Sequence, residues 1–207
     1  MSLNLILEKR FWNQGLKAVV GVDEVGRGSL AGPVVAAAVS FDPRHSPIKG
    51  INDSKRVSPK KRIELNALIR EQARQCVVIS VSAAKINAQG ISAATKHAIS
   101  ACLLEFKHAN IALIDGVWAP QLKFPCKTIV RGDAACYSIA AASIIAKVYR
   151  DTLMKRLSRK YPQYHWDKNM GYGTALHRTM IRQLGPTPYH RTLFIRKTLS
   201  LENPSNN

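Results

Sequence analysis

Acidic residues are scarce in this sequence: 13 Asp and Glu stand against 31 Lys and Arg in 207 residues, a formal net charge of +18 at pH 7. This excess favours an acidic polymer, above all nucleic acid, as the partner. No apolar run approaches the ~20 residues that cross a bilayer, and no lipidation motif is present, so we expect no membrane partner. Charged residues at positions 8–10 interrupt the short apolar N-terminal stretch, which argues against a secretion signal.

Cysteines are also few. Cys76, Cys102, Cys126 and Cys136 lie far apart and include no C-x-x-C pair, which argues against a zinc ribbon or a disulfide framework. Their neighbours are apolar, so we expect reduced, buried or half-buried thiols and a cytoplasmic protein. Internal repeats, low-complexity segments and Gly/Ser-rich linkers are missing as well. We therefore expect a single domain over residues 1–197 and a disordered tail at 198–207.

The apolar residues that are present predict strands and helices in alternation. Short apolar runs, most of them β-branched, predict strands at 18–25, 33–41, 76–81, 110–115 and 128–130. Helical spacing and start signals predict helices at 59–74, 92–108 and 134–160, the last with the strongest signal. Two strands followed by helix–strand alternation indicate a mixed sheet with helices against its faces, an α/β layer architecture.

Four of the scarce carboxylates stand inside or at the ends of apolar segments. Asp23 and Glu24 lie within AVVGVDEV, Asp115 ends IALID, and Asp133 directly precedes the longest helix. An ionised carboxylate is costly to bury unless it is paired or holds a cation. For any one of these acids a Lys or Arg is an adequate partner, and Asp133 alone also suits a helix N-cap.

Together, the four acids point to metal ions. Strand ends meet along one edge of an α/β sheet, and carboxylates that converge there repel each other unless hard divalent cations lie between them. Two such ions ~3.5–4 Å apart hold the attacking and leaving oxygens of a phosphodiester. A basic surface around an acidic centre therefore predicts metal-assisted phosphoryl chemistry on nucleic acid. Because adjacent strand residues face opposite ways, Asp23 and Glu24 can reach one cluster only if the strand bends or ends there.

Two loops near this centre offer donors to a nucleic-acid backbone. Gly26-Arg27-Gly28 follows the acid pair, and its glycines let the main chain approach a sugar or phosphate, including the 2′-hydroxyl that distinguishes RNA from DNA. A lone Gly-x-Gly is otherwise typical of a turn. The loop at 52–56 adds Ser54 and Lys55, which suit either a solvated surface or a phosphate contact.

The long helix and the C-terminal region add further candidates. Ser143, Lys147 and Arg150 fall at i, i+4 and i+7, and we expect their polar heads to emerge near Asp133. Aromatic residues interleave with basic ones after residue 160, a mixture suited to stacking on bases or sugars, although some must belong to the core. The Gly-Tyr-Gly step at 171–173 indicates a bend that presents Tyr172.

These residues carry a resemblance to bacterial ribonuclease HII, the type 2 ribonuclease H. The shared motifs are GVDEVGRG (21–28), NDSKRVS (52–58), LIDG (113–116), RGD (131–133), ASIIAKVYRD (142–151) and GYGT (171–174), in the family's order over about residues 17–195. The resemblance implies an RNase H-like fold with a central five-stranded mixed sheet flanked by helices and a helical C-terminal extension.

The resemblance also implies roles for individual residues. Asp23, Glu24, Asp115 and Asp133 are then the catalytic carboxylates that bind two Mg²⁺ or Mn²⁺ ions. Gly26, Arg27 and Gly28 sense the 2′-hydroxyl, and Tyr172 stacks near the ribonucleotide junction. The chain departs from the family at Ser29, where Pro or Ala is frequent, and at Asn169 and Met170, where a His-Lys pair is frequent; His165 and Lys168 are candidates to replace that pair.

The expected activity is endonucleolytic cleavage of the RNA strand of RNA–DNA hybrids and of single ribonucleotides embedded in duplex DNA. Two-metal-ion hydrolysis on the 5′ side of a ribonucleotide would leave 3′-hydroxyl and 5′-phosphate ends, in a role in ribonucleotide removal from DNA. Two alternatives remain open: another two-metal enzyme such as an exonuclease or a DNA strand-transfer enzyme, and a non-catalytic basic RNA-binding protein. Product analysis separates the first alternative, and dependence on a divalent cation the second. We expect a monomer.

Overall fold

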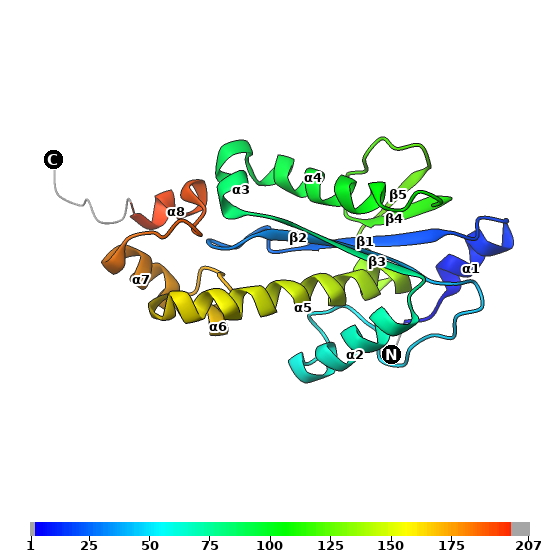
Figure 1. Ribbon diagram of the computed structural model, residues 1–207, viewed down its shortest axis with the longest axis horizontal. Coiled ribbons are helices and arrows are strands. Elements are labelled where there is room, and N and C mark those ends of the chain that lie inside the picture. Colours follow the sequence, from blue (N-terminus) through cyan, green and yellow to red (C-terminus); the bar gives the residue numbers. More distant parts are fainter. Residues whose placement is uncertain (1–2, 200–207) are drawn as a thin grey trace.

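The computed structural model describes residues 3–199, with the side chain of Lys197 left out. Its centre is a five-stranded sheet of order β3-β2-β1-β4-β5 (Figure 1). The strands are β1 (Val19–Val25), β2 (Val34–Ser40), β3 (Gln75–Val81), β4 (Ile111–Asp115) and β5 (Cys126–Ile129). β2 pairs antiparallel with both β1 and β3, whereas β4 pairs parallel with both β1 and β5. The expected mixed five-stranded sheet is therefore confirmed.

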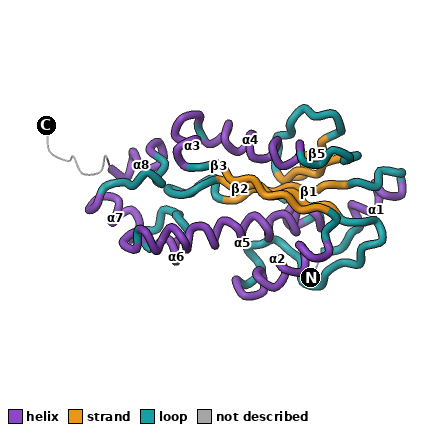
Figure 2. The backbone as a smooth tube through the Cα atoms, in the orientation of Figure 1, coloured by secondary structure: helices purple, strands orange, loops and turns teal. Residues whose placement is uncertain are grey.

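Helices cover both faces of this sheet (Figures 1 and 2). One face carries α3 (Ala83–Gln89) and α4 (Ile91–Leu104), and the other carries α5 (Tyr137–Lys160) with α1 (Ile6–Asn13) and α2 (Pro59–Gln72) packed around it. Alternate residues of β2 accordingly belong to two different hydrophobic clusters, one on each side of the sheet. The predicted α/β layer architecture is confirmed.

Helix α2 begins at the residue that the sequence predicts. Ser58 is its N-cap, with its hydroxyl oxygen accepting a hydrogen bond from the N–H of Lys61 at 3.3 Å, and Pro59 is its first residue. The sequence pattern, however, did not indicate α1 or α3 as helices. Both are short and have only two buried residues each, so neither gives a strong periodic signal.

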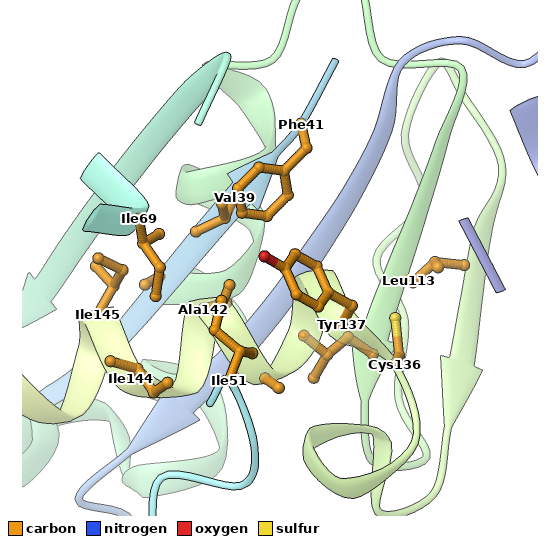
Figure 3. Packing of buried hydrophobic residues seen from close by; sticks show 14 of the residues in the cluster. Val39, Phe41, Ile51, Ile69, Leu113, Cys136, Tyr137, Ala142, Ile144 and Ile145 are labelled. Atoms are coloured by element: carbon orange, nitrogen blue, oxygen red, sulfur yellow. The ribbon is translucent and has the colours of Figure 1, made fainter. Parts of the chain in front are cut away.

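Helix α5 lies against the middle of the sheet. It begins at Tyr137 rather than Ala134, because Gly132–Ala134 form a separate 3₁₀ turn and Cys136 has extended backbone angles. Its first ten residues are all buried between the sheet and the flanking helices. Figure 3 shows Tyr137 at this start, beside Phe41. The hydroxyl oxygen of Tyr137 accepts a hydrogen bond from the N–H of Ile48 at 2.7 Å. This contact anchors the β2–α2 connection to α5.

Two contacts press the start of α5 against β1 and α1. Gly21 of β1 faces Ser138, and a Cβ atom placed on Gly21 would lie only 2.2 Å from the carbonyl carbon of Ser138. From α1, the buried carboxylate oxygen Oε1 of Glu8 accepts hydrogen bonds from the N–H and the hydroxyl of Ser138, each at 2.7 Å. A carboxylate at a helix N-terminus is favoured by the helix dipole. These contacts fix the position of the turn that immediately precedes α5.

The C-terminal part gathers at the far end of α5 (Figure 1). Its helices are α6 (Trp166–Asn169), α7 (Ala175–Leu184) and α8 (Thr192–Leu199), and they enclose a small core around Met154, Trp166 and Ile181. The expected helical C-terminal extension is confirmed. Helix α8 includes the first two residues of the expected tail, and residues 200–207 lie outside the described part. Within residues 3–199 no helix is both long and apolar enough to span a bilayer.

Candidate metal centre and nucleic-acid interface

Three carboxylates meet at the edge of the sheet where β1 and β4 end. These strands are parallel neighbours with Val22 paired to Ile114, so the next residues, Asp23 of β1 and the last residue of β4, Asp115, lie side by side. Asp133 joins them from the 3₁₀ turn between β5 and α5. One oxygen atom from each of the three carboxylates lies within 4.8 Å of the other two. We call this group the carboxylate cluster.

Backbone N–H groups hold two members of the carboxylate cluster in place. Asp23 Oδ1 accepts a hydrogen bond from the N–H of Glu24 at 2.7 Å, and Asp115 Oδ1 accepts one from the N–H of Gly132 at 2.6 Å. The second bond links the end of β4 to the turn that carries Asp133. The position of α5 therefore determines how closely Asp133 approaches the strand ends.

Glu24 lies on the opposite side of β1. The pairing of β1 with β2 continues regularly through Glu24, so its side chain points away from that of Asp23. Its Oε1 lies 3.5 Å from Nη1 of Arg27, and it lines a pocket of about 370 Å³ whose wall includes Asp115. Among the described residues, the carboxylate cluster thus contains three of the four expected acids, and Glu24 adjoins it through the pocket that it shares with Asp115.

Crowding and burial raise the proton affinity of these acids. Burial, followed by the charges of Glu24 and Asp115, raises the pKa of Asp23 well above its ordinary value. Burial is also the largest cause of the raised pKa values of Glu24 and Asp133. A folded protein that holds these groups ionised at neutral pH therefore carries an electrostatic cost that a bound cation would remove.

The donor set fits a hard divalent cation. Carboxylate oxygens are the ligands that Mg²⁺ and Mn²⁺ prefer, and Asp23, Asp115 and Asp133 present them at one point. The Nζ atom of Lys55 lies 3.5 Å from Asp133 Oδ2, but its side chain is 82% exposed, so this ion pair compensates the cluster only weakly. The loop at 52–56 nevertheless brings the cation of Lys55 to the rim of the site.

Replacing one buried acid with its neutral isostere is expected to stabilise the metal-free protein. For Asp23→Asn at pH 7 in EDTA, we expect the Tm to rise by roughly 3–6 °C, since ~1 kcal/mol shifts the Tm of a domain this size by about 2–4 °C. Because the folded pKa of Asp23 lies above its unfolded value, stability is lost as pH rises from about 4 through that raised pKa. The Tm difference between variant and native protein should therefore shrink as the pH falls toward 4.

Thermal unfolding followed by circular dichroism at several pH values measures this effect. Asp42→Asn, a change at an exposed acid outside the cluster, is the matched control. A native Tm equal to or above that of Asp23→Asn at pH 7 in EDTA would contradict the electrostatic cost assigned to the cluster.

Two buried arginines, Arg150 and Arg191, contact the Gly26–Gly28 loop from the protein interior. Gly26 has a φ of 92°, and a Cβ there would strike the Arg150 side chain. Arg191 donates from Nη1 to the carbonyl of Arg27 at 2.8 Å and from Nε to Gly32 at 3.0 Å. Gly28 has open space around it and Arg27 is exposed. Arg191 was not anticipated, because nothing in its local sequence distinguishes it from a surface arginine.

The long helix presents fewer polar groups than the sequence suggested. Ser143 is buried, and its hydroxyl donates to the carbonyl of Ala140 at 2.8 Å, so its predicted emergence near Asp133 is wrong. Arg150 is also buried and is directed to the Gly26–Gly28 loop and its continuation. Lys147 is only partly buried and pairs with the neighbouring Asp151 at 2.8 Å. Ser143 belongs to the first ten residues of α5, which are all buried, whereas exposed positions begin only further along the helix.

Ser54 is likewise less accessible than expected. Its side chain is buried, and its carbonyl accepts a hydrogen bond from Nη1 of Arg62 at 2.6 Å, which ties the 52–56 loop to α2. The loop thus exposes Lys55 rather than Ser54.

Tyr172 is half-buried beside α5, with Lys147 Nζ 5.9 Å and the Arg150 guanidinium 5.4 Å from its ring centre. Among the other interleaved aromatics, Tyr164 and Trp166 belong to the C-terminal core and stack on each other. The sequence singled out Tyr172 through its flanking glycines, but it did not show which of the other aromatic rings belong to the core.

The departures from the family pattern have structural roles. Ser29 accepts a hydrogen bond from Nη2 of Arg150 at 2.8 Å. Asn169 accepts from the N–H of Gly171 at 2.8 Å and donates to the carbonyl of Tyr164 at 2.7 Å, which shapes the turn before Tyr172. Lys168 is exposed in the same segment.

The chain matches a known protein family over most of its length. The family model described as Ribonuclease HII matches residues 20–197. The Ribonuclease HII of Thermosynechococcus vestitus is 47% identical over 201 residues, covering 97% of this chain and 94% of that protein. The Ribonuclease HII of Chlamydia caviae is 44% identical over 191 residues, covering 91% and 89%.

Solved structures show the same fold. The ribonuclease H2 of Pyrococcus horikoshii OT3 superposes with a TM-score of 0.75 at 22% identity, covering 90% of this chain and 99% of that one. Bst-RNase HIII in complex with Mn²⁺ superposes with a TM-score of 0.70 at 19% identity, covering 92% and 71%.

Proposed function

This chain belongs to the ribonuclease HII family, and as a ribonuclease H of that family we propose that it cleaves two kinds of substrate: the RNA strand of RNA–DNA hybrids, and single ribonucleotides embedded in duplex DNA. We place the cut on the 5′ side of a ribonucleotide, which leaves 3′-hydroxyl and 5′-phosphate ends. The observation that carries this proposal is the carboxylate cluster, three acids within 4.8 Å of one another on a chain of net charge +18. The corresponding cellular role is removal of ribonucleotides from DNA.

The carboxylate cluster would hold Mg²⁺ or Mn²⁺, with Glu24 contributing from the side of the pocket that it shares with Asp115. Two bound ions would supply Lewis-acid stabilisation of the phosphodiester in its transition state. The protein's own part is to hold the carboxylates rigidly. The hydrogen bond from Gly132 to Asp115 and the packing of α5 on Gly21 do this.

Other side chains would bind and orient the substrate strand. We propose that the main chain of Gly26, Arg27 and Gly28 contacts the ribose 2′-hydroxyl, because Gly28 is open to solvent and buried Arg191 fixes the loop from behind. Tyr172 would pack against a sugar or base near the junction. Lys55 and Lys147 lie close enough to this edge to contact phosphates.

A labelled DNA duplex with one internal ribonucleotide tests the proposed function, incubated with the protein and Mg²⁺ or Mn²⁺. We expect one cut at the 5′ side of the ribonucleotide, cleavage of an RNA–DNA hybrid beside it, and no cut in an all-DNA duplex. Cleavage of the all-DNA control would favour another two-metal nuclease. Salt-sensitive binding to every nucleic acid without cleavage by either metal would favour a binding protein.

A further inference from the structure

A pocket opens from the carboxylate cluster toward α4. It has a volume of about 370 Å³, and Glu24 and Asp115 form its inner wall. The outer wall comes from two other elements: Ser92, Thr95 and Lys96 on α4, and Trp118 on the connection that follows β4. We call this cavity the Trp118 pocket. Since Asp115 also belongs to the carboxylate cluster, the pocket directly adjoins the proposed site of cleavage.

The outer wall has the chemistry of a nucleotide-binding surface. Trp118 is half-buried and packs on the apolar cluster beneath α4, so its ring is held in place. The Nζ atom of Lys96 lies 5.1 Å from the centre of the Trp118 ring and is otherwise exposed. A fixed aromatic ring can pack against a sugar, and the exposed lysine beside it can contact the adjoining phosphate.

The hydroxyl of Thr95 supports a polar occupant. Its oxygen is buried and has no hydrogen-bond partner among the described residues, although the side chain lies in the pocket wall. A buried polar group without a partner is unfavourable. A hydroxyl or phosphate oxygen in the pocket would supply the missing partner once the Thr95 side chain turns toward it.

The size and charge of the pocket limit what it can hold. Its volume lies at the lower end of the ~300–1,000 Å³ of small-ligand sites, which suits one nucleotide unit and excludes a whole duplex. Glu24 and Asp115 line the inner wall, where Arg27 pairs with Glu24 at 3.5 Å, and Lys96 is the cation of the outer wall, so we expect a phosphate to lie toward Lys96.

We propose that the Trp118 pocket binds the one sugar–phosphate unit of the cleaved strand that directly flanks the scissile bond. The sugar packs on the Trp118 ring, and its outer phosphate lies beside Lys96. This inference rests on the proposed function, because it takes the carboxylate cluster as the place where the strand is cut. It adds a second point of attachment on the face of the sheet opposite to α5.

Two variants separate the parts of this proposal in a binding experiment. The probe is a fluorescein-labelled DNA duplex with one ribonucleotide, titrated in EDTA at several salt concentrations. Trp118→Ala is expected to weaken binding roughly 10-fold without changing the slope of log Kd against log salt. Lys96→Gln is expected to reduce that slope by about 1, the signature of one lost phosphate contact.

Matched controls keep the test specific. Trp118→Phe should bind within about threefold of the native protein, because it retains an aromatic face. Lys107→Gln removes an equal charge beyond the other end of α4 and should alter the slope less than Lys96→Gln does. Native affinity in Trp118→Ala, or equal slopes for the two lysine variants, would overturn the proposal.

Tryptophan fluorescence gives a direct readout of the pocket. Trp12 and Trp166 are buried, so acrylamide quenching reports mainly on Trp118. We expect the unlabelled duplex to protect native protein from quenching, and to have little effect on Trp118→Phe. Unchanged quenching in native protein at saturating duplex would place the strand elsewhere.

The cleavage assay distinguishes failure of this inference from failure of the proposed function. If native protein cuts the duplex and Trp118→Ala cuts it with an unchanged KM, the assignment of the Trp118 pocket is wrong and the proposed function stands. If native protein cuts no ribonucleotide-containing duplex, the proposed function fails, and the binding and quenching results still decide whether the pocket holds nucleic acid. A raised KM with kcat within about twofold in Trp118→Ala supports the assignment.

Discussion

Asp115→Asn is expected to lower the rate of ribonucleotide-directed cleavage on the order of 10³-fold or more. Asp115 is the member shared by the carboxylate cluster and the Trp118 pocket, so its charge acts on both sides of β4. A 10³-fold lower rate corresponds to a loss of ~4 kcal/mol of transition-state stabilisation. A bound metal ion supplies several kcal/mol of such stabilisation, so the loss of one of its carboxylate ligands accounts for this effect. Steady-state rates on the single-ribonucleotide duplex with Mg²⁺ measure the effect.

The same variant should fold normally. Asparagine keeps an oxygen that can accept the hydrogen bond from Gly132, so the turn that carries Asp133 stays attached to β4. Circular dichroism and binding of the labelled duplex in EDTA should match the native protein. Asp42→Asn, at an exposed acid, is the control for the loss of one negative charge and should cleave at the native rate. An Asp115→Asn protein that cleaves as the native protein does would remove this residue from the site.

Gly21→Ala is expected to destabilise the protein by roughly 3 kcal/mol. The added Cβ would lie 2.2 Å from the Ser138 carbonyl carbon and 2.4 Å from the Ile139 nitrogen, both of them backbone atoms in the buried first turn of α5. Neither atom can move without shifting α5, and overpacking of this kind costs ~1–3 kcal/mol or more. At about 2–4 °C per kcal/mol, the Tm should fall by roughly 6–12 °C.

Gly28→Ala is the matched control for Gly21→Ala in the unfolding experiment. A Cβ on Gly28 meets nothing within 4 Å, so its Tm should stay within about 2 °C of the native value. Where Gly21→Ala remains folded, cleavage should also fall, because a shift of α5 moves Asp133 away from Asp23 and Asp115. If Gly21→Ala unfolds at the Tm of the native protein, the position of α5 does not depend on the close approach of Ser138 to Gly21.

Local chemistry made several elements predictable from sequence. The Ser58-Pro59 pair fixes the start of α2, since a hydroxyl acceptor and a preset φ act over three or four residues only. The apolar runs gave the strands, and a carboxylate inside one run and at the end of another gave Asp23 and Asp115. The start of α5 was placed three residues early, because Cys136 has extended angles that depend on the adjoining 3₁₀ turn rather than on its own side chain.

Side-chain direction was less predictable than position. Ser143 has helical spacing with Lys147, but α5 is enclosed by the sheet and by α2, so spacing did not reveal which of the two reaches solvent. Glu24 shows the same limitation on a strand: pairing with β2 continues through it and directs it away from Asp23. Nothing in the sequence singled out Trp118 as a site residue. It is a lone aromatic in a Pro-containing connection, and only the tertiary structure places it beside α4.

The sequence by itself determined the chemical character of this protein: a basic chain with four of its 13 acids inside or at the ends of apolar segments, the motifs of ribonuclease HII, and the order of the strands and of the three longest helices. These features depend on residue type and short-range spacing, which act within a few residues of the chain. Only the tertiary structure decided that Asp23, Asp115 and Asp133 form the close cluster while Glu24 faces the Trp118 pocket, and that Arg150 and Arg191 support the Gly26–Gly28 loop from within. The physical reason is that these contacts join segments far apart in sequence, and strand pairing and the packing of α5 fix their distances.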